Sequence, residues 1–166
     1  VEAGNRRNDK LYRSNGITTF FQSKDGRPSS FRILLNGAPV MENQNGYPSG
    51  MNYKTLMHEL LHVATQAEIQ YLNYTDANNP AVGELKRLYN KVADEFLAQE
   101  KAGTLPQFLV DFRKGNNNAL ESVDEMLTWS MTDERMQKWM SEIKVGEKTL
   151  FSKIIDLIRS VMGIAK

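Results

Sequence analysis

Two histidines and one glutamate lie within five consecutive residues of this 166-residue chain: His58, Glu59 and His62. These are the only two histidines of the chain. Residues four apart on a helix share one face, so both imidazoles can bind a single metal ion. The glutamate after the first histidine lies beside them, where its carboxylate can act as general base on a metal-activated water. The pattern His-Glu-x-x-His therefore predicts a hydrolytic zinc site.

The same histidines have a second interpretation, as hydrogen-bonded side chains in an ordinary core. The segment around them, Thr55 to Thr65, is apolar almost all the way round, which predicts a central, buried helix. Polar side chains inside such a helix are costly to bury unless something compensates them. A divalent cation would compensate them, so the metal site is the favoured interpretation.

The third ligand has to come from elsewhere in the chain. A catalytic zinc ion has three protein ligands and one open position. The chain has no cysteine and no third histidine, which leaves Asp or Glu, or a weaker Tyr or Asn. The predicted helix from Asn118 to Met131 is the best source, because Glu121 and Glu125 lie one turn apart on it. One would bind the metal and the other would accept from a ligand histidine. A solvated acidic face is the alternative.

The segment TLMHELLHVAT, followed by a helix that carries glutamates, resembles the zincin metallopeptidases of the gluzincin type. Together with VDEMLTWSMTDERMQKWM, it is similar to the small metallopeptidase-like domains in large polyvalent proteins of phages and other mobile elements. The resemblance extends from Thr55 to Met140. It implies a zincin-like α+β fold, in which a small N-terminal antiparallel sheet packs on a mainly helical domain with a central active-site helix.

The resemblance also implies roles for individual residues. His58 and His62 would be zinc ligands, Glu59 the general base and Glu125 the third ligand. In the gluzincin spacing, an acidic residue follows the ligand glutamate by four positions. This spacing would select Glu121 as the ligand instead, with Glu125 as the acidic residue that follows it. A peptide would add in extended form to an edge of the sheet, and Glu59 would pass a proton from water to the leaving amine. Candidate donors to the oxyanion are Tyr71, Tyr74, Asn116 and Asn117.

The remaining pattern predicts a short β region followed by helices. Two strands, Gly16 to Ser23 and Ser30 to Gly37, are expected to form a hairpin, and a turn-rich loop is expected from Met41 to Gly50. Helical spacing of apolar residues predominates from Tyr53 onward. The expected helices are Tyr53 to Tyr71, Pro80 to Gly103 with Asn79 as cap, Pro106 to Phe112, Ala119 to Met131, a helix capped by Thr132 that reaches Ile143, and Glu147 to Met162.

Composition narrows the classes of function. The 21 Lys and Arg residues nearly balance the 20 Asp and Glu residues. The net charge is therefore too small to give the protein an overall positive electrostatic field that would attract nucleic acid or acidic lipid. No apolar run reaches the roughly eighteen residues that a membrane span needs. The amphipathic last helix is expected to pack on the core rather than lie on a membrane. The expected partner is a protein or peptide substrate, with no nucleic acid and no membrane.

These observations predict one soluble domain over residues 1–166, in the cytoplasm or associated with a virion. Because the chain begins at Val1 rather than at methionine, it is expected to be a processed product or a domain cut from a longer chain. The resemblance implies that it is part of a larger polyprotein or phage assembly. The expected function is that of a zinc-dependent metalloendopeptidase. The alternative is a catalytically inactive zincin scaffold that serves as a structural or interaction module of a larger phage or mobile-element protein.

Overall fold

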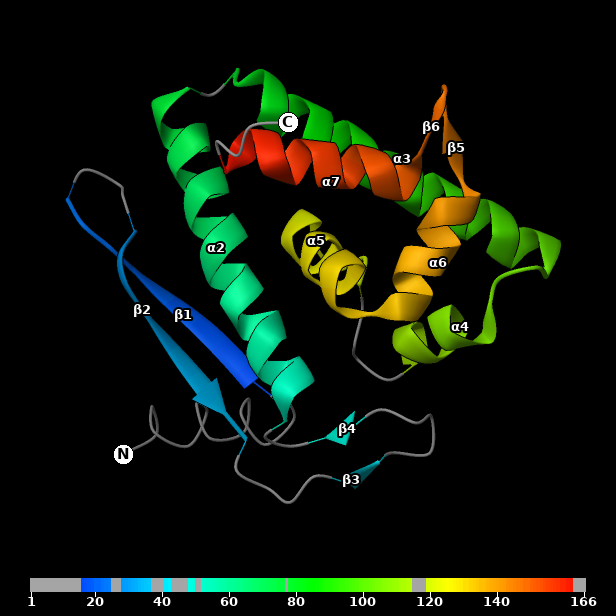
Figure 1. The fold of residues 1–166 in the computed structure, drawn as a ribbon, viewed down its shortest axis with the longest axis horizontal. Coiled ribbons are helices and arrows are strands. Elements are labelled where there is room, and N and C mark those ends of the chain that lie inside the picture. Colours follow the sequence, from blue (N-terminus) through cyan, green and yellow to red (C-terminus); the bar gives the residue numbers. More distant parts are fainter. Residues whose placement is uncertain are drawn as a thin grey trace. The chain divides into compact units, whose positions relative to one another are not determined.

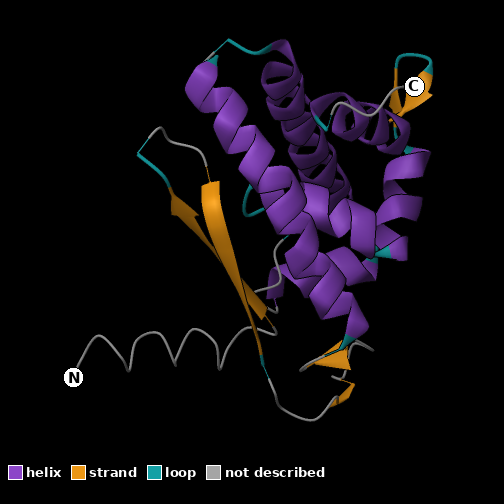
Figure 2. Cartoon of the chain, turned by 60° about the vertical axis from the view of Figure 1, so that its left-hand side comes forward, coloured by secondary structure: helices purple, strands orange, loops and turns teal. Residues whose placement is uncertain are grey.

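A computed structural model describes residues 16–24, 28–36, 41–42, 48–49, 52–76, 78–114 and 119–162. The chain divides into two compact units, Val1–Ala67 and Glu68–Lys166. The mixed α+β composition predicted from the sequence is confirmed, since the described residues are mostly helical with small antiparallel strand pairs (Figure 2). A single domain over the whole chain stays a prediction.

The first unit contains the predicted hairpin. Strands β1 (Gly16–Gln22) and β2 (Pro28–Leu35) pair antiparallel, with Gly16 opposite Leu35 and Thr18 opposite Ile33 (Figure 1). Residues 25–27, in the connection between the two strands, lie outside the described residues. A second, very short pair lies in the segment predicted to be a loop: β3 (Met41–Glu42) and β4 (Pro48–Ser49).

Helix α2 (Tyr53–Thr75) starts in the first unit and carries both histidines. Asn52 caps it, because its Oδ1 accepts the backbone N–H of Thr55 at 3.0 Å. The prediction that this helix is buried on nearly every side is wrong, since Leu56 and Leu60 are 37% and 39% exposed. Instead, the buried residues of α2 are all polar: Thr55, Glu59, His62 and Thr65.

The buried polar face of α2 follows from helical spacing. Thr55, Glu59 and His62 are separated by four and then three positions, so they lie along one side of the helix. In the first unit, the Thr18 hydroxyl on strand β1 bonds to Glu59 on this side of the helix. The Glu59 carboxylate is therefore buried with a hydrogen-bond partner, which reduces the cost of removing it from water.

The second unit is a set of helices around a common core. Its helices are α3 (Pro80–Ala102), α4 (Gln107–Lys114), α5 (Val123–Thr132), α6 (Glu134–Glu142) and α7 (Leu150–Val161). Helix α3 packs against α5 and α7, and α6 packs against the same two helices (Figure 1). Large, fully buried side chains from these four helices fill the core: Leu85, Leu88, Met126, Met136, Leu150 and Ile154.

The boundaries predicted for α3 are confirmed. The side chain of Asn79 accepts the backbone N–H groups of Ala81 and Val82, and Pro80 occupies the first turn. Gly103 ends the helix in the left-handed conformation, with φ of 71°. Each of these signals acts on backbone groups only a few residues away from it, which explains why the sequence revealed both ends of the helix.

The predicted start of α5 at Ala119 is wrong. The helix begins at Val123, because the Oγ of Ser122 accepts the backbone N–H of Glu125 at 3.0 Å. Ser122 and Glu125 have the Ser-x-x-Glu spacing of a capping box, which is the sequence signal that would have located this start. Glu121 consequently precedes the helix and does not share a helical face with Glu125.

Two later boundaries also differ from the sequence expectation. Asp133, rather than Thr132, caps α6: its Oδ1 accepts the backbone N–H groups of Arg135 and Met136. Helix α7 starts at Leu150 and is capped by Thr149, not at Glu147. A small hairpin precedes it, formed by β5 (Lys144–Val145) and β6 (Lys148–Thr149), with φ of 67° at the intervening Gly146.

Helix α7 packs on α3 and α6 through Leu150, Ile154 and Leu157, which confirms the predicted core role of the last helix. Across the stretches of chain that the structure describes, none of the helices combines the length and the apolar character needed to cross a bilayer.

Replacing Leu88 by Ala should destabilise the second unit by about 2–5 kcal/mol, because it leaves a cavity in the core. Leu88 has 0% of its surface exposed. Leu97 on the same helix is 56% exposed and provides the matched control, for which we expect a change within about 0.5 kcal/mol. Urea unfolding of both variants measures the difference, and equal losses would contradict the described core.

Candidate metal centre

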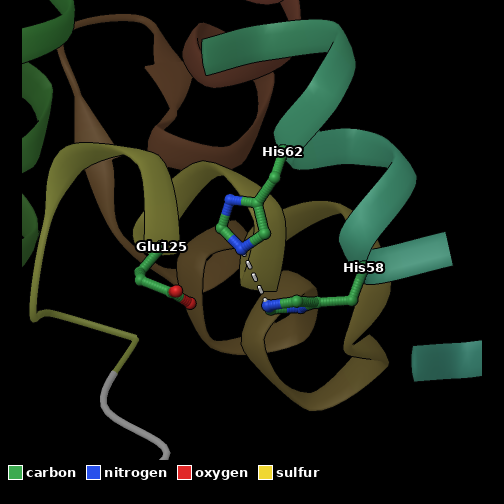
Figure 3. Close-up of side chains that lie close together, drawn as sticks. All are labelled: His58, His62 and Glu125. Atoms are coloured by element: carbon green, nitrogen blue, oxygen red, sulfur yellow. Dashed lines mark hydrogen bonds between the residues drawn. The ribbon is translucent and has the colours of Figure 1, made fainter. Parts of the chain in front are cut away.

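The two histidines of α2 direct their Nε2 atoms toward each other. These nitrogens lie 3.1 Å apart, and the two ring planes meet at 80° (Figure 3). His62 is buried and His58 is half-buried. The prediction that the spacing of four brings both imidazoles to one point is therefore confirmed.

The separation of the two nitrogens suits a shared zinc ion. Zinc binds histidine nitrogen at about 2.0–2.1 Å, and tetrahedral geometry then separates two such nitrogens by about 3.3 Å. The observed 3.1 Å is close to that value.

Glu125 belongs to the same group of side chains. One ligand atom each from His58, His62 and Glu125 all lie within 4.8 Å of one another (Figure 3). Glu125 is half-buried and lies in the first turn of α5, where Ser122 holds its backbone N–H. Two nitrogens and one carboxylate oxygen match the donor set of a catalytic zinc site with two histidines and one glutamate.

Glu121, the alternative third ligand, is placed differently. It is exposed and precedes α5, and it is not a member of the metal-binding group found among the described residues. A shared helical face for Glu121 and Glu125 requires one helix that continues through both, whereas the cap at Ser122 starts α5 after Glu121.

The candidate general base, Glu59, is buried with only 5% of its surface exposed. Its Oε2 accepts a hydrogen bond of 2.6 Å from the hydroxyl of Thr18 on β1. The two residues are 41 positions apart. Sequence reasoning missed Thr18, and it had no signal to use, since threonine is common in strands and forms no motif with the histidines.

The candidate oxyanion donors gain no support from their positions. Tyr74 is 64% exposed near the end of α2. Tyr71 lies nine residues after His62, which corresponds to about 13 Å along a helix axis. Asn116 and Asn117 lie outside the described residues. None of these four side chains is therefore assigned to the site.

The site thus combines a converging pair of imidazoles, a carboxylate close to them, and a second, buried carboxylate anchored to a strand. Two imidazoles and one carboxylate are donors that suit a divalent cation, and a carboxylate such as that of Glu59 is a group that accepts protons. Comparisons of the chain with protein-family models, with curated proteins and with solved structures gave no match at all.

Proposed function

We propose that this protein is a zinc-dependent metallopeptidase of the zincin type. The observation that carries the proposal is the group of His58, His62 and Glu125, whose ligand atoms lie within 4.8 Å, in a His-Glu-x-x-His frame. The intervening Glu59 is buried and accepts a hydrogen bond from Thr18, and it is the residue that we propose as general base. The proposed substrate is a protein or peptide.

Two helices would position the three proposed ligand residues. His58 and His62 would bind the ion through their Nε2 atoms, which already converge to 3.1 Å on a continuous helix. Glu125 would complete the set from the first turn of α5, whose backbone is fixed by Ser122. A zinc ion held by these residues supplies a Lewis acid and brings the pKa of a water molecule at the site toward about 7.

Glu59 carries the proton in the proposed reaction. It accepts a proton from the attacking water as the water oxygen bonds to the carbonyl carbon of the peptide. It then donates this proton to the amide nitrogen as the C–N bond breaks, which releases the amine and regenerates the carboxylate. Its burial keeps bulk water away from the carboxylate between the two transfers.

Zinc titration of two glutamate variants tests the ligand set. We expect one zinc ion per wild-type chain and a loss of affinity of at least about 10- to 100-fold in Glu125→Ala, since even indirect supports of a zinc ligand contribute that much. Glu121→Ala is the matched control and should bind zinc as the wild type does. Equal affinity in the two variants would exclude Glu125 as a ligand.

Hydrolysis of fluorescein-labelled casein by the zinc-loaded chain tests the activity. We expect hydrolysis that stops when a chelator removes the zinc and returns when zinc is restored. A wild-type protein that binds zinc but leaves casein and broad peptide libraries intact would exclude the peptidase. That result would favour the inactive zincin scaffold in its place.

A further inference from the structure

Strand β1 holds Glu59 from a position remote in sequence. The Thr18 hydroxyl donates to Oε2 of Glu59 at 2.6 Å and lies 3.2 Å from the backbone oxygen of the same residue. A length of 2.6 Å falls in the range of strong hydrogen bonds to carboxylates. Both residues belong to the first unit, Val1–Ala67.

Gly16 supplies the space that this carboxylate occupies. A Cβ atom at Gly16 would lie 2.6 Å from Oε1, 2.8 Å from Cγ and 2.9 Å from Cδ of Glu59. Real Cβ atoms essentially never approach so closely, so any larger residue would displace the Glu59 side chain. The glycine at this position therefore acts through its lack of a side chain.

Gly16 and Thr18 lie on the same side of β1, because residues two apart on a strand point to the same side. Together they form the surface against which the Glu59 carboxylate packs, and this pair of residues is called the seat. Pairing with β2 stiffens the seat, since Gly16 lies opposite Leu35 and Thr18 opposite Ile33. Threonine is also stiff at χ1, so its hydroxyl has few positions available. The orientation of the Glu59 carboxylate is thus restricted by the Thr18 hydrogen bond at Oε2 and by the Gly16 backbone beside Oε1.

We infer that Thr18 is a positioning residue for the proposed hydrolysis, acting through Glu59, and that Gly16 completes the seat. This inference rests on the proposed function. The Thr18 bond uses one lone pair of Oε2, and the remaining lone pairs of the carboxylate can take up the proton from water. A carboxylate held in one orientation meets the water without first searching among rotamers, and small misplacements of catalytic groups are known to slow reactions strongly.

Substitutions of Thr18 separate positioning from packing. Thr18→Val keeps the shape of the side chain and removes only the hydroxyl, whereas Thr18→Ser keeps the hydroxyl. Thr19→Val is the matched control, because Thr19 is the neighbouring threonine on the opposite side of β1, opposite Arg32. Gly16→Ala tests the space beside the carboxylate.

The measurements are initial rates of labelled-casein hydrolysis over a range of casein concentrations, zinc affinity by titration, and the midpoint of urea unfolding. For Thr18→Val and Gly16→Ala we expect kcat to fall about 10- to 100-fold, with KM and zinc affinity within about twofold of wild type. Thr18→Ser should return kcat to within about threefold of wild type, and Thr19→Val should match wild type. The double variant Thr18→Val with Glu59→Ala should lower the midpoint of urea unfolding by less than the sum of the two single effects. The reason is that both substitutions remove the same hydrogen bond.

Three results would overturn the inference. In an active wild-type enzyme, Thr18→Val with kcat within twofold of wild type, or with the same loss as Thr19→Val, excludes a positioning role. A loss of activity that parallels a loss of zinc or of stability shows that Thr18 is structural only. A wild-type chain that binds zinc and hydrolyses no casein excludes the proposed function itself, and the positioning role with it.

Discussion

Replacing Glu59 by Gln should lower the rate of casein hydrolysis by about 100- to 10,000-fold while zinc remains bound, since general base catalysis typically contributes that much. Glutamine has the size of glutamate but cannot take the proton from water. Its amide oxygen can still accept the Thr18 hydroxyl, which bonds to Oε2 in the wild type. The fold and the zinc site should therefore be preserved, and the loss should appear in kcat.

The control for this variant is Glu68→Gln, a half-buried glutamate on the same helix that belongs to no part of the proposed site. It should retain wild-type activity and zinc content. Residual hydrolysis in Glu59→Gln within tenfold of wild type would show that another group moves the proton. Loss of zinc in the same variant would indicate that Glu59 supports the metal rather than the chemistry.

Replacing either His58 or His62 by Ala should weaken zinc binding by more than about 100-fold and abolish hydrolysis. Each removes one of the two nitrogens that converge to 3.1 Å, and a single remaining imidazole with one carboxylate leaves zinc short of the three protein ligands typical of catalytic sites. Titration of the metal-free variants with zinc in the presence of a competing chelator measures the affinity directly.

Thermal unfolding gives an independent measurement of the same prediction. A ligand that binds only the folded protein stabilises it by about 2.7 kcal/mol at 100 times its Kd, so zinc should raise the melting temperature of the wild type. The increase should vanish in both histidine variants and persist in Gln66→Ala, one turn beyond His62 on α2. If zinc raises the melting temperature of His62→Ala as much as that of the wild type, the ion binds elsewhere.

How far the fold could be predicted depended on the range of the interactions that set each boundary. Helix α3 was placed correctly because Asn79, Pro80 and Gly103 act on backbone groups a few residues away. The start of α5 does not follow from apolar spacing, because this spacing continues back to Ala119. The helix starts at Val123 instead, where the Ser122 hydroxyl accepts the backbone N–H of Glu125 in the first turn. Helical periodicity alone does not mark where a cap replaces the preceding turn.

The same distinction applies to the candidate site. Helix geometry makes residues at i and i+4 neighbours, so the convergence of His58 and His62 followed from their spacing and needed no knowledge of the rest of the fold. The choice between Glu121 and Glu125 did not follow from spacing. It depended on the cap at Ser122, which leaves Glu121 before the helix and Glu125 inside it.

The surroundings of Glu59 depended entirely on contacts between distant parts of the chain. Its hydrogen bond to Thr18 spans 41 positions, and the space for its carboxylate comes from a missing side chain at Gly16. Neither strand residue forms a pattern with the histidines in the linear sequence, because a strand and a helix meet only after the backbone has folded. The convergence of the two histidines therefore followed from five consecutive residues. The surroundings of the proposed base arise instead from tertiary packing, in which a buried carboxylate must find a hydrogen-bond partner wherever the chain supplies one.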